Sequence, residues 1–208
     1  TLGDLGFLAG EPDLARAAIE RGVRMSESQG AVSLQGAHGR LGRQLLLDGR
    51  AAEAVEALEH ALSFCSDGSR QAEPWLRQAL AQAWLAAGDP ARARAIAEET
   101  LNGCLQIGAR LFAIEAALVL SVALRAETGV TAAARIDEVL ATADRLIAES
   151  GACNMTAFVL VERAALSALH DDARQQEMHL RHAHEAFTKM GATGRARQTA
   201  AALGKLAS

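Results

Sequence analysis

The sequence predicts an all-α solenoid of about five helical hairpins within its 208 residues. Hydrophobic residues, mostly Ala and Leu, make up 50% of the chain, and Ala, Leu, Arg and Glu form helices readily. Turn glycines recur with a period of 39 residues, which is typical of a solenoid. The three prolines each stand where a helix would begin. The glycines are Gly10, Gly49 and Gly88, and the prolines are Pro12, Pro74 and Pro90.

The hairpin over residues 69–108 shows the unit most clearly. Gly88 suits the left-handed backbone that often ends a helix, Asp89 can cap the next helix, and Pro90 fits its first turn. We predict one elongated domain over residues 1–208. Its repeats cover 1–30, 31–68, 69–108, 109–151 and 152–191, followed by a capping helix within 192–208. The first repeat is truncated, so we expect the chain to be part of a longer protein.

The other helices follow from the same turn signals. Helical segments are predicted over 1–9, 11–28, 31–47, 51–65, 109–126, 131–150, 155–170 and 195–206. A further helix is predicted to follow the turn at 171–172 and to end at 190. The cluster Ser66-Asp67-Gly68-Ser69 is a predicted turn. The last inner turn is Asp171-Asp172, which has no glycine.

Small residues recur at fixed distances from the inner turn. Close helix crossings need small side chains, so we expect these positions to be buried contacts. They lie seven residues before the turn glycine, and five and twelve residues after it. In the second and third repeats they are Gly42, Ala54, Ala61, Ala81, Ala93 and Thr100. In the fourth repeat, whose turn is one residue longer, the corresponding residues are Ser121, Ala134 and Ala141. The fifth repeat has Gln176 and Ala183 at the last two positions.

This pattern resembles the tetratricopeptide repeat (TPR), which has Leu-Gly or Leu-Ala in its first helix, a Gly-Asp turn, and Ala five and twelve residues later. Leu80-Ala81, Gly88-Asp89 and Ala93 fit it, as do Leu41-Gly42 and Ala54. The period is longer than the 34 residues of that repeat. The resemblance implies a right-handed α-α superhelix whose first helices line a concave groove.

The residues from Phe187 to Ala196 look like the closing motif of the repeat region in bacterial class III adenylate/guanylate cyclase–AAA ATPase proteins. Related repeats occur in kinase–ATPase fusions and LuxR-type regulators. The resemblance implies a regulatory region of a larger signalling protein. The phosphate loop GxxxxGK[ST] is absent, so nucleotide chemistry is not expected within this sequence.

Composition argues against several classes of function. The net charge is −4 and no two Lys or Arg residues are adjacent, which argues against nucleic-acid binding. No run of eighteen apolar residues predicts a membrane span. Cys65, Cys104 and Cys153 form no CxxC pair and fit free thiols in a reducing cytoplasm. Cys65 and Cys104 are one repeat apart, so we expect equivalent core positions.

The residues that could form a metal site are His179, His182 and His184 with Glu185. His179 and His182 share a helix face, but His184 points elsewhere, and zinc needs three or four converging ligands. A solvated helix face is the interpretation we favour. No catalytic constellation or cofactor motif stands out. The predicted groove contacts are Arg40, Arg43, Arg77, Gln78, Gln82, Trp84, Arg110 and Arg163.

Three functions are compatible with this pattern. The favoured hypothesis is a non-catalytic module that binds a protein or peptide, with upstream domains of the same chain or a second copy as candidate partners. The alternative is a peptide-binding TPR receptor or the repeat domain of a transcription regulator. An enzyme with an unrecognised site is the third.

Overall fold

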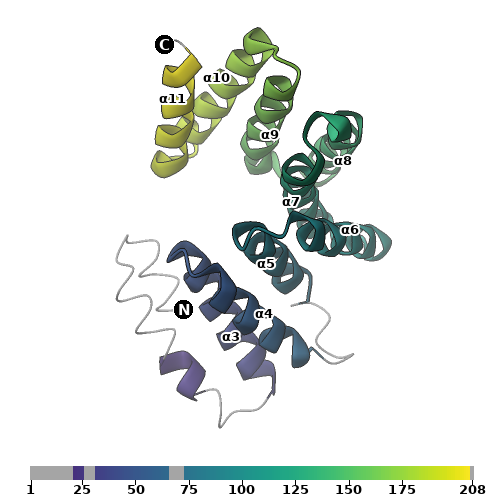
Figure 1. Ribbon diagram of the computed structural model, residues 1–208, viewed down its shortest axis with the longest axis vertical. Coiled ribbons are helices and arrows are strands. Elements are labelled where there is room, and N and C mark those ends of the chain that lie inside the picture. The colour runs from purple at the N-terminus through teal and green to yellow at the C-terminus, as the bar shows by residue number, and fades with distance from the viewer. Residues whose placement is uncertain (1–20, 26–30, 66–72, 207–208) are drawn as a thin grey trace. The chain divides into compact units, whose positions relative to one another are not determined.

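The computed structural model describes residues 21–25, 31–65 and 73–206 (Figure 1). Within these ranges the chain forms α-helices, two short 3-10 segments and the turns that join them, without any strand. The predicted all-α class is confirmed. Of the helix predicted over 11–28, residues 21–25 are described and are helical; the rest of it, the helix predicted over 1–9 and the turn predicted at 66–69 lie outside the described residues. The chain divides into two compact units between Ile96 and Ala97.

The first unit is built on α3 (Ala31–Leu47), α4 (Ala51–Ser63) and α5 (Glu73–Ala86), and it includes the start of α6 (Pro90–Ile107). Its core is a cluster of leucines and alanines contributed by these helices. Leu58 of α4 and Leu76 of α5 are fully buried in it. The apolar stripes of successive helices therefore face one shared core.

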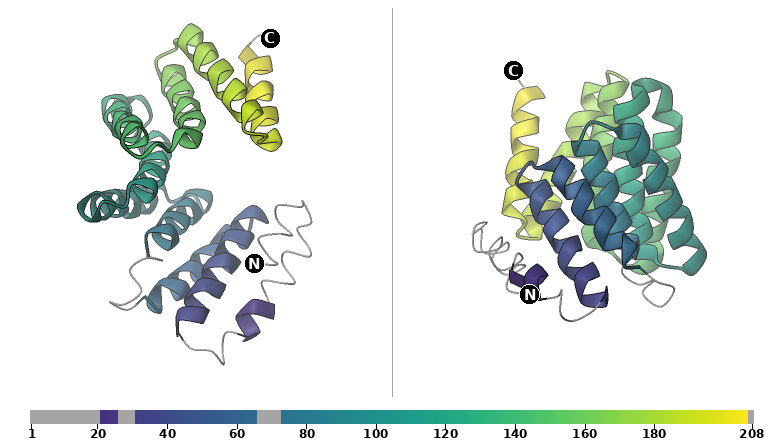
Figure 2. Two further views of the ribbon diagram at one scale, coloured as in Figure 1. Left: turned by 180° about the vertical axis from the view of Figure 1, so that it is seen from behind. Right: turned by 60° about the horizontal axis from the view of Figure 1, so that its bottom comes forward.

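The second unit continues from α6 through α7 (Arg110–Thr128), α8 (Ala133–Ser150) and α9 (Thr156–Leu169) to α10 (Ala173–Lys189) and α11 (Thr193–Leu206). The 3-10 segments Gly129–Ala132 and Cys153–Met155 precede α8 and α9. Both views of Figure 2 agree with Figure 1 that α9, α10 and α11 lie side by side. Phe187 of α10 is buried among them, and its ring meets Phe158 edge-on at 5.1 Å between centroids.

The inner turns have the predicted form. Gly49 and Gly88 are left-handed, with φ of 74° and 85°. Asp171 takes the same conformation, φ 54°, in the hairpin that has no turn glycine. The amides of Asp89 and Asp172 then donate to the carbonyls of residues five positions earlier, at 2.9 and 3.0 Å. Both aspartates also cap the following helix, because each Oδ1 accepts a backbone N–H at 3.0 Å.

The predicted small positions of the second and third repeats are buried. Ala54, Ala61 and Ala93 are fully inaccessible to solvent. A Cβ added at Gly42 would lie 2.4 Å from Cγ of Leu58, so only glycine fits this crossing of α3 and α4. Ala183 in α10 is buried as well.

In the fourth repeat the predicted small position Ser121 of α7 is buried, but the register predicted for α8 is wrong. Ala134 and Ala141 are exposed, and the buried residues with the same seven-residue spacing are Ile136 and Ala143. The reason is the 3-10 segment, which adds residues between the turn glycine Gly129 and the start of α8.

Three smaller predictions are also corrected. Helix α7 runs on to Thr128, where a turn is predicted from residue 127. Helix α11 begins at Thr193, inside the predicted Gly-Ala-Thr-Gly break. Cys104 is a core residue, but Cys65 is only half-buried and accepts a hydrogen bond from Gln35 Nε2 at 2.7 Å, so the two cysteines are not equivalent. In the described part of the chain, no helix has the length and apolar character of a membrane span.

Candidate functional site

An open cleft of about 540 Å³ lies in the second unit, between the first turns of α8, the second half of α9 and the first turns of α10. Its volume is within the range of small-ligand clefts, roughly 300–1,000 Å³. Ala133, Ala134 and Leu166 give it an apolar wall. The polar residues that line it are Asp137, Arg163, Ser167, His170, Asp172, Gln175 and His179.

Helical spacing explains why these side chains converge. On α9, Arg163 and Ser167 are one turn apart and share one face of the helix, and His170 is the capping residue directly after its end. On α10, Gln175 and His179 share a face one turn apart, directly after the capping residue Asp172. Two consecutive hairpins thus contribute one face from each of three helices.

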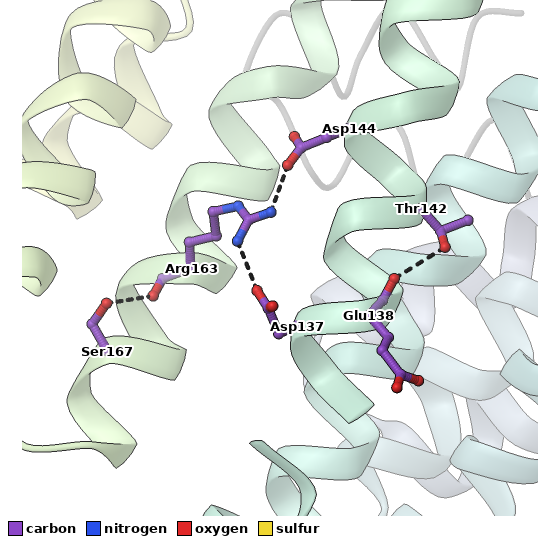
Figure 3. Close-up of polar contacts among 6 residues, drawn as sticks. All are labelled: Asp137, Glu138, Thr142, Asp144, Arg163 and Ser167. Atoms are coloured by element: carbon purple, nitrogen blue, oxygen red, sulfur yellow. Dashed lines mark hydrogen bonds and ion pairs between the residues drawn. The ribbon is translucent and has the colours of Figure 1, made fainter. Parts of the chain in front are cut away.

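Arg163 joins α9 to α8 through two carboxylates (Figure 3). Its two terminal nitrogens lie 3.0 Å from Asp137 Oδ1 and 2.6 Å from Asp144 Oδ2. Asp137 and Asp144 are two helical turns apart on α8, so they flank the guanidinium from one helix face. Burial alone would lower the pKa of Arg163, but the hydrogen bonds and charges of Asp144 and Asp137 outweigh it and raise that pKa. Arg163 is therefore charged, held in place and already paired with the carboxylates of Asp137 and Asp144.

His179 differs from the other residues of the cleft. Its Nδ1 is buried and has no hydrogen-bond partner among the described residues. Burial lowers the pKa of His179, electrostatic interactions with Arg163 and His182 lower it further, and Asp172 only partly opposes them. The ring is therefore neutral at pH 7. The interpretation of the histidine cluster as a solvated face is wrong for His179, which is only partly exposed.

His184 is turned to the opposite side, as the sequence predicts. Its Nδ1 lies 3.0 Å from the carbonyl oxygen of Ala196 and 3.3 Å from Oγ1 of Thr199, both on α11. His182 is exposed. Across the described ranges, no group of three or more His, Cys, Asp or Glu side chains could hold a metal ion together.

Glu162, next to Arg163, ties α9 to a different helix. Its Oε2 accepts hydrogen bonds from Ser121 Oγ and from an Arg125 terminal nitrogen, both on α7 and both at 3.2 Å. Burial raises the pKa of Glu162, and Arg125 and Ser121 only partly counteract this. Two consecutive residues therefore fix α9 against both α7 and α8.

The other predicted groove contacts are spread over both units. Arg77 pairs with Glu73 within α5 at 2.8 Å, and Arg110 lies 3.5 Å from Glu149. The guanidinium of Arg92 lies 4.4 Å above the ring of Trp84. The remaining four lie on α3 and α5: Arg40, Arg43 and Gln82 are exposed and Gln78 is half-buried. Of the eight, Arg163 alone lines the cleft described above, and contact of the others with a partner stays a prediction.

Sequence reasoning missed Asp137, Asp144, Asp172 and Gln175 as parts of one site. The seven-residue spacing of the two aspartates on α8 is the signal that could have found the first pair. Comparison with protein-family models and with curated proteins finds no match for this chain.

Proposed function

We propose that this chain is a non-catalytic helical-repeat module that binds a segment of a partner protein. The observation that carries the proposal is the cleft shared by α8, α9 and α10, which needs two consecutive hairpins to form. Stacked repeats bind their partners on such extended surfaces between neighbouring units. The charged groups of the cleft are held by ion pairs and a helix cap, so they are positioned before a partner arrives.

The chemistry of the cleft favours binding over catalysis. Among the residues that line the cleft, Ser167 has the side chain that could act as a nucleophile. Its hydroxyl donates a hydrogen bond to the carbonyl oxygen of Arg163 at 3.0 Å. A serine nucleophile needs an adjacent general base, and this hydroxyl points along its own helix instead. Arg163 is charged and paired with two carboxylates, and such a fixed arrangement of charges suits the recognition of a partner.

We also propose that the module is the C-terminal sensor or scaffold region of a larger bacterial signalling ATPase or nucleotide cyclase. The support is the resemblance of the repeats and of the closing segment from Phe187 to Ala196. Mass spectrometry of the intact native protein tests it. An upstream phosphate loop and cyclase-type domain are expected, and a parent protein made only of repeats would overturn it.

Binding of a protein segment is tested with a displayed library of random peptides selected on the full chain. We expect saturable binding of the selected peptides by calorimetry, in the micromolar range. Amide exchange should slow in α8, α9 and α10 when the peptide is bound. If no peptide gives saturable binding, or if protection appears only in α3–α5, the cleft is not the binding site.

A further inference from the structure

Negatively charged side chains outnumber positively charged ones around the cleft between α8, α9 and α10. Asp137 and Asp172 line the cleft, and Asp144 pairs with Arg163 beside it, so three carboxylates stand in this region against one guanidinium. His179 adds no positive charge because its ring is neutral. The region therefore carries an excess of negative charge, although Arg163 is the first residue that a search for an anion site would select.

The charged neighbours do not reverse this excess. Arg135 pairs with Glu138 on α8 at 3.0 Å, and Arg181 pairs with Glu177 on α10 at 2.6 Å. Asp171 and Arg174, both exposed, flank the cleft with opposite charges. His170 and His182 are the other titratable groups on the adjoining faces of α9 and α10.

The two carboxylates that line the cleft are more exposed to solvent than the guanidinium of Arg163. The side chain of Asp137 is 62% exposed, whereas that of Arg163 is 24% exposed and both its terminal nitrogens are engaged. Asp172 is exposed, and in the described structure its carboxylate accepts a hydrogen bond from the amide of Gln175 as the cap of α10. An incoming cation can reach both aspartates without breaking an existing ion pair, but an incoming anion would have to displace Asp137 or Asp144.

We propose that this cleft receives the cationic side chain of a lysine or arginine in the partner segment, bound by the carboxylates of Asp137 and Asp172. The inference rests on the proposed binding function and names the chemistry of the partner. Leu166 and the two alanines of α8 contact the apolar stem of such a side chain, and the two carboxylates accept hydrogen bonds from its charged end. Arg163 sets the position of Asp137 and repels a second cation.

The test uses pools of short peptides with blocked ends. One central position is fixed as Lys, Arg, Gln or Glu, and the other positions are randomised among uncharged residues. Binding to the full chain is measured by fluorescence anisotropy at neutral pH. We expect the Lys and Arg pools to bind about tenfold more tightly than the Gln pool, with a preference that falls as salt screens the charges.

The matched variants preserve shape and change charge. Asp137→Asn with Asp172→Asn should abolish the preference, and asparagine caps a helix as well as aspartate does, so α10 is retained. Glu138→Gln with Glu177→Gln removes two carboxylates from the same helices outside the cleft and should leave the preference intact. A preference that survives the first pair of changes, or disappears with the second, overturns the inference.

Arg163→Gln separates a cation site from an anion site. A cation site keeps or strengthens its preference for Lys and Arg, because two carboxylates lose their internal counterion; an anion site loses all charge preference. Circular dichroism confirms that the variant is folded. Equal binding of all pools, or tighter binding of the Glu pool, overturns the inference while the proposed function stands. Absence of binding by every pool overturns both.

Discussion

Two inner turns of this chain have the same backbone conformation but differ in the partners of their capping aspartates. Gly88-Asp89 joins α5 to α6, and Asp171-Asp172 joins α9 to α10, each with a left-handed residue followed by a capping aspartate. At the first turn Arg92 pairs with Asp89 at 3.2 Å and stacks over Trp84, which neutralises the carboxylate locally. At the second turn Asp172 has no arginine partner in the described structure and faces the cleft. Both hairpins have a capping aspartate, but of the two only Asp172 lacks an arginine partner among the described residues.

The largest expected effect concerns a core residue near the C-terminal end of α10. Sixteen residues after the left-handed residue, α10 has Phe187 where α6 has Cys104, and both are buried. Phe187→Ala should lower the free energy of unfolding by about 3–5 kcal/mol because it leaves a cavity against Phe158. Cys104→Ala removes far less volume and should cost about 1 kcal/mol. Urea denaturation measures both; equal losses would contradict the register of the two hairpins.

Five residues after the left-handed residue, the two hairpins should differ in how strongly they respond to a leucine. Ala93 is fully buried, so Ala93→Leu should destabilise by roughly 1–3 kcal/mol through overpacking, as should Ala54→Leu at the same position of the second repeat. Gln176 stands at this position in α10 and is only half-buried, so Gln176→Leu should change stability by less than about 0.5 kcal/mol. Thermal melting that shows the reverse order would mean that the small positions are not the helix contacts.

The left-handed residues can be exchanged between the turns. Asp171→Gly should stabilise the protein by about 0.5–1 kcal/mol, because glycine adopts a positive φ without a Cβ clash. Gly88→Asp should destabilise by a similar amount for the same reason. If denaturation midpoints move in the same direction for both variants, backbone conformation is not what distinguishes the two turns.

The smallest effect is a pH dependence confined to the second hairpin. Burial and the nearby cations lower the pKa of His179 below its ordinary value of 6.5, so the unfolded chain binds the proton more tightly than the folded chain. The stability linked to the neutral ring is complete above about pH 6.5 and is lost as pH falls through that value to the folded pKa. His179→Gln should flatten the stability profile below about pH 6.5. The exposed His170→Gln is the control, and an equal flattening by it would contradict the assignment.

Helix ends were largely predictable from the sequence because local groups set them. Gly88, Asp89 and Pro90 determine their turn within a few residues, and the Asp171-Asp172 turn was found for the same reason. The register of α8 was not predictable, since the 3-10 segment after Gly129 moved Ala134 and Ala141 outward. The cleft depends on contacts between helices: Arg163 was identified as a polar residue of its helix, but its partners Asp137 and Asp144 follow only from how α9 packs on α8.

Glu162 and Arg163 also determine how far α9 can turn about its own axis. Neighbouring residues of a helix point about 100° apart, and these two carry opposite charges that meet opposite charges on α7 and on α8. Alanine and leucine contacts alone would tolerate a small rotation, because they have no directional bonds. Any such rotation of α9 must stretch both ion pairs at once. The rotation of α9 about its own axis is therefore fixed, and the cleft face that carries Arg163 and Ser167 keeps its orientation relative to both neighbouring helices.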